Sequence, residues 1–447
     1  MARIYRKIGL LDHMGGGNLG DDATQDAVMH NIKKRWPYVK MVMFSMNPDD
    51  TRKRHGIPSY AIRAKTWGFG ATRDENEIQI TSLKNEKNKG AQKSWVIALK
   101  SRYSILFSLV RIISNVVIRK PFAFFQELIF LLKSHNIIKS FDLLIICGGG
   151  QLLDCWGGPW KFPYTIFKWV ILAKISKVKC FFLNVGAGPL DHRLSKIFIR
   201  KALSFADYVS FREDKSEKLI REIGFCGGSQ VFPDSVYSLE AAVQNKNNND
   251  RNGNPIVGIA PMPFRDPRVY WEKDKTFYDI FIRKLAQFSS WLIENDYFLA
   301  LFGSDISHDP LAVNDLNMSL KNEYNWSSKS CITKESINTT SELLLRMASM
   351  DYVVTCRLHG VIFAHLMNKP ILAISHHPKV NILMSDIGLS EYCVDINNFY
   401  SDTLVKKFKH LVENKVDIKK RMAEKLVCYR KELTDQFDVL FQKEVSE

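Results

Sequence analysis

Apolar runs and helically spaced apolar residues alternate along most of this sequence. Short β-branched and aliphatic runs, typical of buried strands, occur at 4–11, 142–147, 180–185, 208–211, 256–260, 298–302, 351–355 and 371–375. Helical spacing follows most of them, at 162–177, 194–206, 277–295, 341–350 and 361–367, and another helix is expected from about Asp22. Because parallel strands need a crossover, usually a helix, this alternation predicts an α/β fold with parallel sheets.

One polar stretch interrupts the alternation and predicts the domain organisation. Residues 244–255, QNKNNNDRNGNP, have almost nothing to bury and several turn formers, so we interpret them as a linker. The sequence then predicts a Rossmann-like first domain at 1–243 and a Rossmann-like second domain at 256–405. Residues 406–447 are predicted to form one or two terminal helices that pack back on the first domain.

The first domain is expected to contain an insertion at about 51–135. Its first part, to about residue 94, is charged and irregular in pattern. Residues 95–133 are instead rich in aliphatic and aromatic side chains, carry basic positions, and contain Pro121, which is expected to separate two helical segments. Two hypotheses fit this segment: a pair of helices that covers the core, or a cationic amphipathic hairpin that lies on an anionic membrane.

The charge balance favours anionic partners. The formal net charge is +16, which suits an acidic polymer, phosphorylated substrates, nucleic acid or an anionic membrane surface. No RNA-binding, zinc-finger or helix-turn-helix signature is present, so nucleic acid is not expected as a partner. The eight cysteines form no CxxC pair, no secretory leader is evident, and no apolar run approaches the ~18 residues of a spanning helix. We therefore expect a cytoplasmic protein, with peripheral association at the inner membrane face through 95–133 as a further hypothesis.

Two glycine-rich turns follow predicted strands in the first domain. Near the amino terminus, HMGGGNLGDD contains Asn18, Gly20 and Asp21 as candidates to face a ligand. After the strand at 142–147, GGGQLLD places Gly149 and Gly150 where bare backbone lies at the carboxyl edge of a sheet. The first turn does not have the spacing of a dinucleotide or Walker motif, and close packing alone also explains its glycines.

Residues 351–379 carry the strongest chemical signal. Arg357 and His359 lie between a predicted strand and helix, where unpaired backbone N–H groups and the helix dipole favour an anion. Arg212 ends another strand in the same way. From these residues alone, a structural ion pair and a helix cap remain the alternatives to an anion site.

The ordered set GGGNLGDDA, DLLIICGGGQLLD, VGAGPL, SFREDKS, FPDS and TCRLHGVIFAHLMNKPILAISHHPKV resembles the polysaccharide pyruvyl transferases. The resemblance extends from about 18 to 389, apart from the insertion. It implies a GT-B-like fold, in which two Rossmann-like domains face each other across a cleft. It also implies transfer of the pyruvyl group of phosphoenolpyruvate to two sugar hydroxyls, with release of phosphate.

The resemblance also implies roles for single residues. The donor-binding positions correspond to Arg212, Arg357, Leu358 and His359, and Lys379 is a further donor candidate. His359 is our candidate acid, because histidine titrates near neutrality. Candidates for the base that activates the acceptor are Asp21 first, then Asp22 and Asp154.

This sequence departs from the family pattern in two places. His376 and His377 stand where family members often carry tyrosine and aspartate, and Glu213 replaces an aspartate. Adjacent histidines on extended backbone point to opposite faces and no third ligand is evident, so no metal site is predicted. No cofactor is expected beyond the donor substrate.

Two other functions are kept as alternatives. One is a GT-B glycosyltransferase that uses a nucleotide sugar, and the other is a catalytically silent assembly factor that binds anionic glycans or membrane. The acceptor sugar, its hydroxyl pair, the ketal stereochemistry and the oligomeric state are not predicted. The acceptor class is a sugar or a lipid-linked oligosaccharide.

Overall fold

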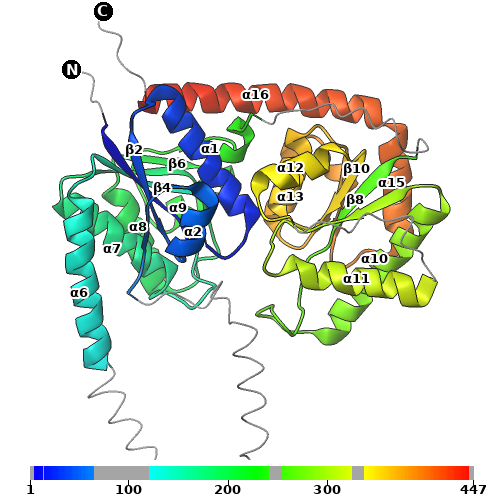
Figure 1. Cartoon of the computed structure of the whole chain (residues 1–447), viewed down its shortest axis with the longest axis horizontal. Helices are drawn as coiled ribbons and strands as arrows, with labels where there is room; N and C mark the ends of the chain where they lie inside the picture. Colours follow the sequence, from blue (N-terminus) through cyan, green and yellow to red (C-terminus); the bar gives the residue numbers. More distant parts are fainter. Residues whose placement is uncertain (1–4, 14, 65–119, 241–253, 325–336, 442–447) are drawn as a thin grey trace, which may run out of the picture.

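The structure, a computed structural model, describes residues 5–13, 15–64, 120–240, 254–324 and 337–441. These residues form two α/β domains that lie side by side (Figure 1). Parallel sheets in two domains agree with the fold class predicted from the alternating pattern. Most of the predicted linker, and residues 65–119 of the predicted insertion, lie outside the described residues.

The first sheet has seven described strands, all parallel, in the order β3-β2-β1-β4-β5-β6-β7. Its strands are β1 (Lys7–Leu11), β2 (Lys40–Ser45), β3 (Ser59–Ala61), β4 (Leu143–Leu152), β5 (Lys179–Ala187), β6 (Tyr208–Phe211) and β7 (Gln230–Val231). Its helices are α1 (Leu19–Arg35), α2 (Pro48–His55), α6 (Lys120–Ile138), α7 (Phe162–Ile175), α8 (Arg193–Ser204), α9 (Asp214–Glu222) and the short η2 (Ser235–Ser238).

The start of the predicted insertion belongs to the sheet. Residues 51–61 were expected to be irregular, but they contain most of the helix α2 and the strand β3, which extends the first sheet at its edge. Asn47 caps α2 by accepting from the N–H of Asp50, and acidic residues occupy its first turn. A short, highly charged helix buries almost no apolar surface, so hydrophobic spacing gave no signal for it. The described part of 95–133 belongs to α6, and the segment that was expected to precede Pro121 lies outside the described residues.

The second sheet has five described strands, also parallel, in the order β12-β11-β10-β8-β9. They are β8 (Ile256–Ala260), β9 (Phe298–Leu301), β10 (Tyr352–Thr355), β11 (Ile371–Ser375) and β12 (Cys393–Asp395). The helices are α10 (Lys275–Glu294), α11 (Asp309–Tyr324), α12 (Thr340–Ala348), α13 (Leu358–Leu366), α14 (Pro378–Asp386), η4 (Ser390–Tyr392), α15 (Ser401–Glu413) and α16 (Lys415–Phe441).

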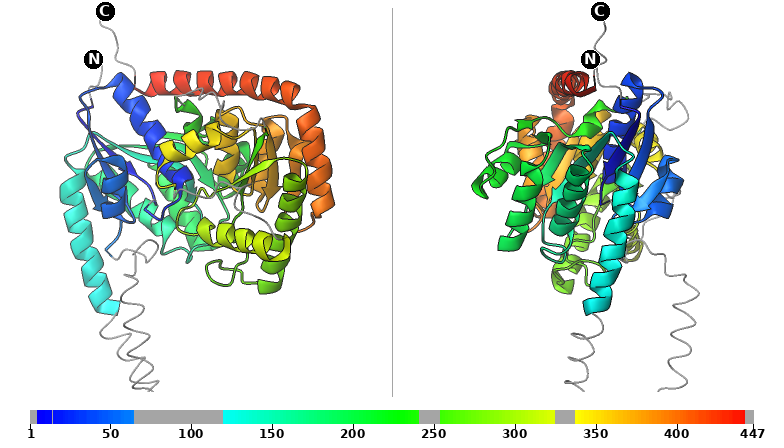
Figure 2. Two further views of the ribbon diagram at one scale, coloured as in Figure 1. Left: turned by 45° about the vertical axis from the view of Figure 1, so that its right-hand side comes forward. Right: turned by 90° about the vertical axis from the view of Figure 1, so that its left-hand side faces the viewer.

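The last helix, α16, runs along both domains (Figures 1 and 2). On the second domain, Lys425 of α16 contacts Asp386 at 3.0 Å. On the first domain, Gln436 exchanges two hydrogen bonds with the buried amide of Asn184, and Asp438 pairs with Arg35 at 2.6 Å. This is the arrangement expected for the terminal helices, although the pair begins at Ser401, so the predicted boundary at 405 falls inside α15.

One of two clusters of buried apolar residues extends through both domains. Ile8 and Leu10 on one face of β1 belong to the same cluster as Val354 and Phe437, in the second sheet and in α16. Leu11, on the opposite face of β1, belongs to a second cluster with α7 and α8. This cluster packs the two domains against each other.

Candidate active site

Each sheet has a topological switch point, where neighbouring strands lead to helices on opposite faces and ligands bind. In the first sheet it lies between β1 and β4, and in the second between β8 and β10. His13 follows β1, Met262 follows β8 and Arg357 follows β10. All three side chains line one cavity of about 360 Å³ between the domains.

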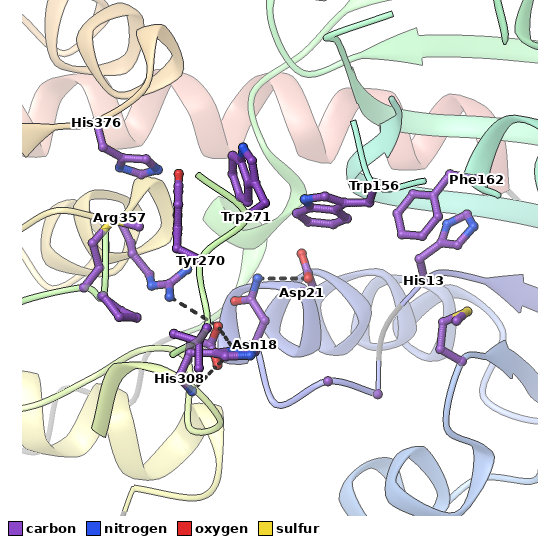
Figure 3. A pocket seen from close by; sticks show the side chains of 17 residues that line it. His13, Asn18, Asp21, Trp156, Phe162, Tyr270, Trp271, His308, Arg357 and His376 are labelled. Carbon is purple, nitrogen blue, oxygen red and sulfur yellow. Dashed lines mark hydrogen bonds and ion pairs between the residues drawn. The ribbon is translucent and has the colours of Figure 1, made fainter. Parts of the chain in front are cut away.

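The cavity has a polar end, a central segment from α1 and an aromatic end (Figure 3). Arg357, His308 and His376 lie at the polar end, and Asn18 and Asp21 lie near the middle. The aromatic end carries the side chains of Trp271, Trp156 and Phe162, and Tyr270 stands between Trp271 and Arg357. Both domains therefore contribute to one surface, which carries charged and hydrogen-bonding groups next to an apolar wall.

Arg357 is held by two carboxylates. It immediately precedes α13, and its Nη2 lies 2.6 Å from Oδ1 of Asp309 and 3.2 Å from Asp305. Asp309 is buried and also accepts the backbone N–H groups of Ser304 and Asp305. The bonds to Asp309 use Nε and Nη2, while Nη1 has no hydrogen bond within the described part of the chain. The guanidinium group of Arg357 is thus fixed in orientation, and its Nη1 is available to a ligand.

Asp21 is a carboxyl group with a perturbed pKa in the middle of the cavity. Asn18 caps α1 by accepting from the N–H of Gly20 and donates to Asp21 Oδ2 at 2.9 Å. Burial, and then the negative charge of Asp22, raise the pKa of Asp21 to about 7. Such a carboxyl group is suited to exchange a proton near neutral pH.

The other two candidate bases have structural partners. Asp22 lies 3.6 Å from both Arg54 and His55 and does not line the cavity. Asp154 accepts backbone N–H groups from Asp191 and His192, at 3.1 and 2.9 Å, and anchors the turn before α8. Asp21 is therefore the candidate base that the structure places at the cavity.

His359 lies between the two domains and does not line the cavity of Arg357. Its Nε2 is 3.9 Å from Asp234, and no hydrogen-bond partner for Nε2 is present among the described residues. Burial lowers the pKa of His359 to about 4, so the imidazole is neutral at pH 7. This differs from the expected near-neutral titration, because the ring is removed from water.

Three predicted donor residues line a second cavity, of about 680 Å³. They are Arg212, Leu358 and Lys379. Arg212 pairs with Asp234 at 3.0 Å, and both side chains are 6% exposed. Lys379 is aimed at Gly188 O at 3.5 Å, and burial together with the charge of Arg212 lowers its pKa to about 8. The predicted donor set is thus divided between two cavities, and His359 stands between them.

The glycines near the end of β4, which were expected to form a turn after it, lie between these groups. A Cβ on Gly149 would stand 3.3 Å from Oδ1 of Asp21, and one on Gly150 would stand 4.0 Å from Nζ of Lys379. Gly149 has a φ of +77°, which other residues rarely adopt. These glycines thus keep bare backbone between the candidate base and the candidate donor lysine.

The two histidines that depart from the family pattern have separate positions. His376 lines the first cavity, and its Nδ1 lies 2.8 Å from the carbonyl of Cys356. His377 caps α14 by accepting from the N–H of Lys379 at 3.3 Å. Burial lowers the pKa of each ring to about 4. Within the described ranges, no group of three or more His, Cys, Asp or Glu side chains is arranged to hold a metal ion.

Sequence reasoning missed several residues of the cavity. Asp305, His308 and Asp309 follow β9 in the segment GSDISHD, and this position at a strand end was the available signal. Trp156 and Trp271 lie in loops, where no periodic pattern marks an exposed aromatic side chain.

Comparison with known proteins decides the family. The sequence pattern of the polysaccharide pyruvyl transferase family matches residues 18–378. The chain belongs to this family. It is therefore a transferase, and the matched region includes Arg212, Arg357 and His359. A comparison with curated proteins gives no match.

The solved structures similar to this transferase include GT-B glycosyltransferases and epimerases. They include a putative UDP-N-acetylglucosamine 2-epimerase from Listeria monocytogenes, with 10% identity, a TM-score of 0.57 and coverage of 99% of this chain and 98% of that one. A glycosyltransferase from Rickettsia africae has 10% identity and a TM-score of 0.55 over 99% of both chains. The structure of S. aureus MnaA with UDP has 11% identity and a TM-score of 0.54, and covers 96% of this chain and 94% of that one. At these identities the similarity shows the fold alone.

Proposed function

We propose that this transferase moves the pyruvyl group of phosphoenolpyruvate to two hydroxyls of a sugar, in a surface polysaccharide or its lipid-linked precursor. Family membership supports polysaccharide pyruvylation. The observation that carries the donor assignment is the position of Arg357, which precedes α13 at a switch point and has one guanidinium nitrogen directed to no protein group in the described chain. Such a position suits a carboxylate or phosphate.

The reaction balances without a redox step. A proton adds to the methylene carbon of phosphoenolpyruvate, so that the neighbouring carbon becomes electrophilic. One sugar hydroxyl attacks this carbon, and the second hydroxyl then displaces phosphate. The two hydroxyls lose two protons in all. One of these balances the proton that was added to the methylene carbon, and the other leaves with phosphate. The protein must therefore bind an anion, supply a proton and accept one.

The described residues provide groups for each task. Arg357, Arg212 and Lys379 are the cations from the two sides of the cleft that hold the donor. Asp21, with a pKa raised to about 7, accepts the proton of the attacking hydroxyl. The paired carboxylates of Asp309 and Asp234 hold the two arginines in place before the donor binds.

His359 is the proposed acid, and its protonation is coupled to the donor. The imidazole is neutral in the ligand-free protein, since burial disfavours its charged form. A phosphate close to Nε2 would favour the imidazolium and raise the pKa of His359. His359 then donates its proton only when the donor is bound, and stabilises the charge of the departing phosphate.

The deciding experiment measures phosphate release from phosphoenolpyruvate with a panel of acceptor glycans. Acceptor-dependent release, with a ketal detected on the glycan by mass spectrometry, supports the proposal. The fold of the similar solved structures fits a nucleotide-sugar glycosyltransferase as well as it fits the main proposal. Transfer of a sugar from a UDP-sugar, without phosphate release from phosphoenolpyruvate, would establish that alternative. A silent glycan-binding factor would show neither reaction.

We further propose peripheral membrane association through the predicted insertion. Within the described residues, no helix has the length and apolar character that a transmembrane span requires. Residues 95–119 lie outside the described ranges, but α6 carries Phe124, Phe125 and Leu132 with exposed fractions of 71, 59 and 59%. Exposed aromatic and aliphatic side chains on one helix of a protein with charge +16 suit an anionic membrane surface.

A further inference from the structure

The aromatic end of the first cavity is not explained by donor chemistry. Trp156 lies in the loop after β4, and Trp271 lies in the loop after β8, so each domain contributes one indole ring. Their exposed fractions are 43 and 60%. Large aromatic side chains that remain exposed at the opening of a cavity are typical of a ligand-binding surface.

Neighbouring rings hold both indoles in place. Trp271 stacks on Tyr270 with ring centroids 4.0 Å apart, and Trp156 meets the edge of Phe162 at 5.6 Å. Phe162 stacks in turn on His13 at 3.5 Å. The indole faces are therefore supported before a ligand arrives, which lowers the entropy lost on binding.

We infer that Trp156 and Trp271 form a platform that binds a pyranose ring of the acceptor. This inference rests on the proposed function, because that ring carries the hydroxyls to be pyruvylated. A pyranose has faces of C–H groups and a rim of hydroxyls, so its faces pack on aromatic rings while its rim reaches polar groups. In Figure 3, Asp21 lies close to the two indoles, on the side of α1. A ring on the platform thus presents its hydroxyls to the candidate base.

Charge argues against a nucleotide on the same platform. An aromatic end also suits a nucleobase, but its diphosphate would then extend past Asp21 toward the polar end of the cavity. There, the position beside Arg357, which Asp305 and Asp309 hold in place, is the one that the proposed function gives to the donor, so the diphosphate would compete with phosphoenolpyruvate for it. A neutral sugar carries no such charge, and a cavity of about 360 Å³ is large enough for a sugar ring.

The test measures glycan binding without any donor. The probes are methyl glycosides and disaccharides of hexoses and N-acetylhexosamines, with UDP as a separate probe, and the variants are Trp156→Ala and Trp271→Ala. The matched control is Trp160→Ala, because Trp160 is 64% exposed and near Trp156 in sequence, yet packs on Tyr164 and Phe198 outside the cavity. Saturation-transfer NMR gives both the affinity and the protons of the glycan that contact the protein.

We expect each cavity variant to weaken glycan binding about tenfold, while the control binds as the wild type does. Saturation is expected on ring C–H protons of one face. The inference is overturned if no probe glycan binds the wild type, if both variants bind like the wild type, or if the variants lose only UDP. Tryptophan-dependent glycan binding without phosphate release from phosphoenolpyruvate would leave the platform in place and remove the proposed function.

Discussion

Gly20 and His359, which come from opposite domains, are packed against each other. A Cβ placed on Gly20 would stand 2.0 Å from Nδ1 of His359 and 2.2 Å from its Cγ. No Cβ makes contacts this short, so only glycine at this position lets α1 approach the ring. The approach brings the start of α1, which carries Asp21, against the start of α13, which follows Arg357.

Gly20→Ala is expected to lower turnover at least tenfold. Alanine is the better helix former by about 1 kcal/mol, so the change favours α1 itself. The clash instead moves the ring of His359 or separates the domain faces, which misplaces the proposed acid. The measurement is kcat for phosphate release together with the thermal midpoint. Gly228→Ala is the control, because a Cβ there meets no atom within 4 Å. Equal turnover in both variants would show that the contact is unimportant for catalysis.

Arg357→Ala should raise the KM for phosphoenolpyruvate about 10- to 100-fold, the range for a lost charge-assisted hydrogen bond. The variant also leaves the buried Asp309 without its cation, so a loss of up to about 3 kcal/mol in unfolding free energy is expected.

Two further variants separate donor binding from stability. Asp309→Asn preserves the shape of the side chain at position 309 and leaves Arg357 in place. It should therefore retain donor binding better than Arg357→Ala does. Arg221→Ala, an exposed arginine on α9, is the neutral control. Unaltered donor affinity in a folded Arg357→Ala protein would remove the anion-site assignment.

The pH dependence of kcat/KM should be a narrow bell. Asp21 must be deprotonated to act as a base, so the rate rises as pH increases through about 7. Lys379 must be protonated to attract the donor, so the rate falls as pH increases through about 8. Lys379→Arg keeps its charge at higher pH, and the alkaline limb should therefore move upward. An alkaline limb that is unchanged in this variant would assign it to another group.

Much of the fold was predictable from the sequence because parallel strands are buried on both faces. The runs at 208–211, 256–260 and 371–375 coincide with β6, β8 and β11. The apolar run in β2 was visible in the sequence, yet our interpretation omitted it. β4 extends to Leu152, beyond the predicted end at 147, because Gly149 and Leu152 still pair with β5 across an irregularity in the register.

The candidate site was predictable only to the level of strand ends. In each parallel sheet these ends lie at one edge, so Arg212 and Arg357 were predicted from their positions at strand ends, and Asp21 from its position in a glycine-rich turn. Tertiary packing decides which cavity each side chain lines. Because of this packing, the predicted donor residues are divided between two cavities. The carboxylate partners Asp234 and Asp309 come from other segments of the chain, and no local pattern in the sequence pairs them with an arginine.

Replacement of the exposed apolar residues of α6 is expected to weaken membrane binding. Phe124→Ser, Phe125→Ser and Leu132→Ser together remove the large side chains that would insert between lipids. Sedimentation with vesicles of phosphatidylglycerol and phosphatidylethanolamine measures the bound fraction. The control replaces Val427 and Val439 of α16, which are 68 and 80% exposed, with serine. If the α6 variant sediments like the wild type, this helix is not the anchor.

His359 should change its protonation when the donor binds. Its pKa of about 4 in the free protein is set by burial, and a bound phosphate supplies the negative charge that favours the imidazolium. NMR of ¹³C-labelled histidine, titrated with and without inorganic phosphate, should show the pKa of this one ring moving up toward neutrality. His359→Ala should lower kcat about 100-fold or more with a smaller effect on the KM for phosphoenolpyruvate. His410→Ala is the control, since that side chain is 52% exposed and remote from both cavities. A ring that stays neutral in saturating phosphate, combined with unchanged turnover in His359→Ala, would exclude the acid role and leave His359 as the packing partner of Gly20.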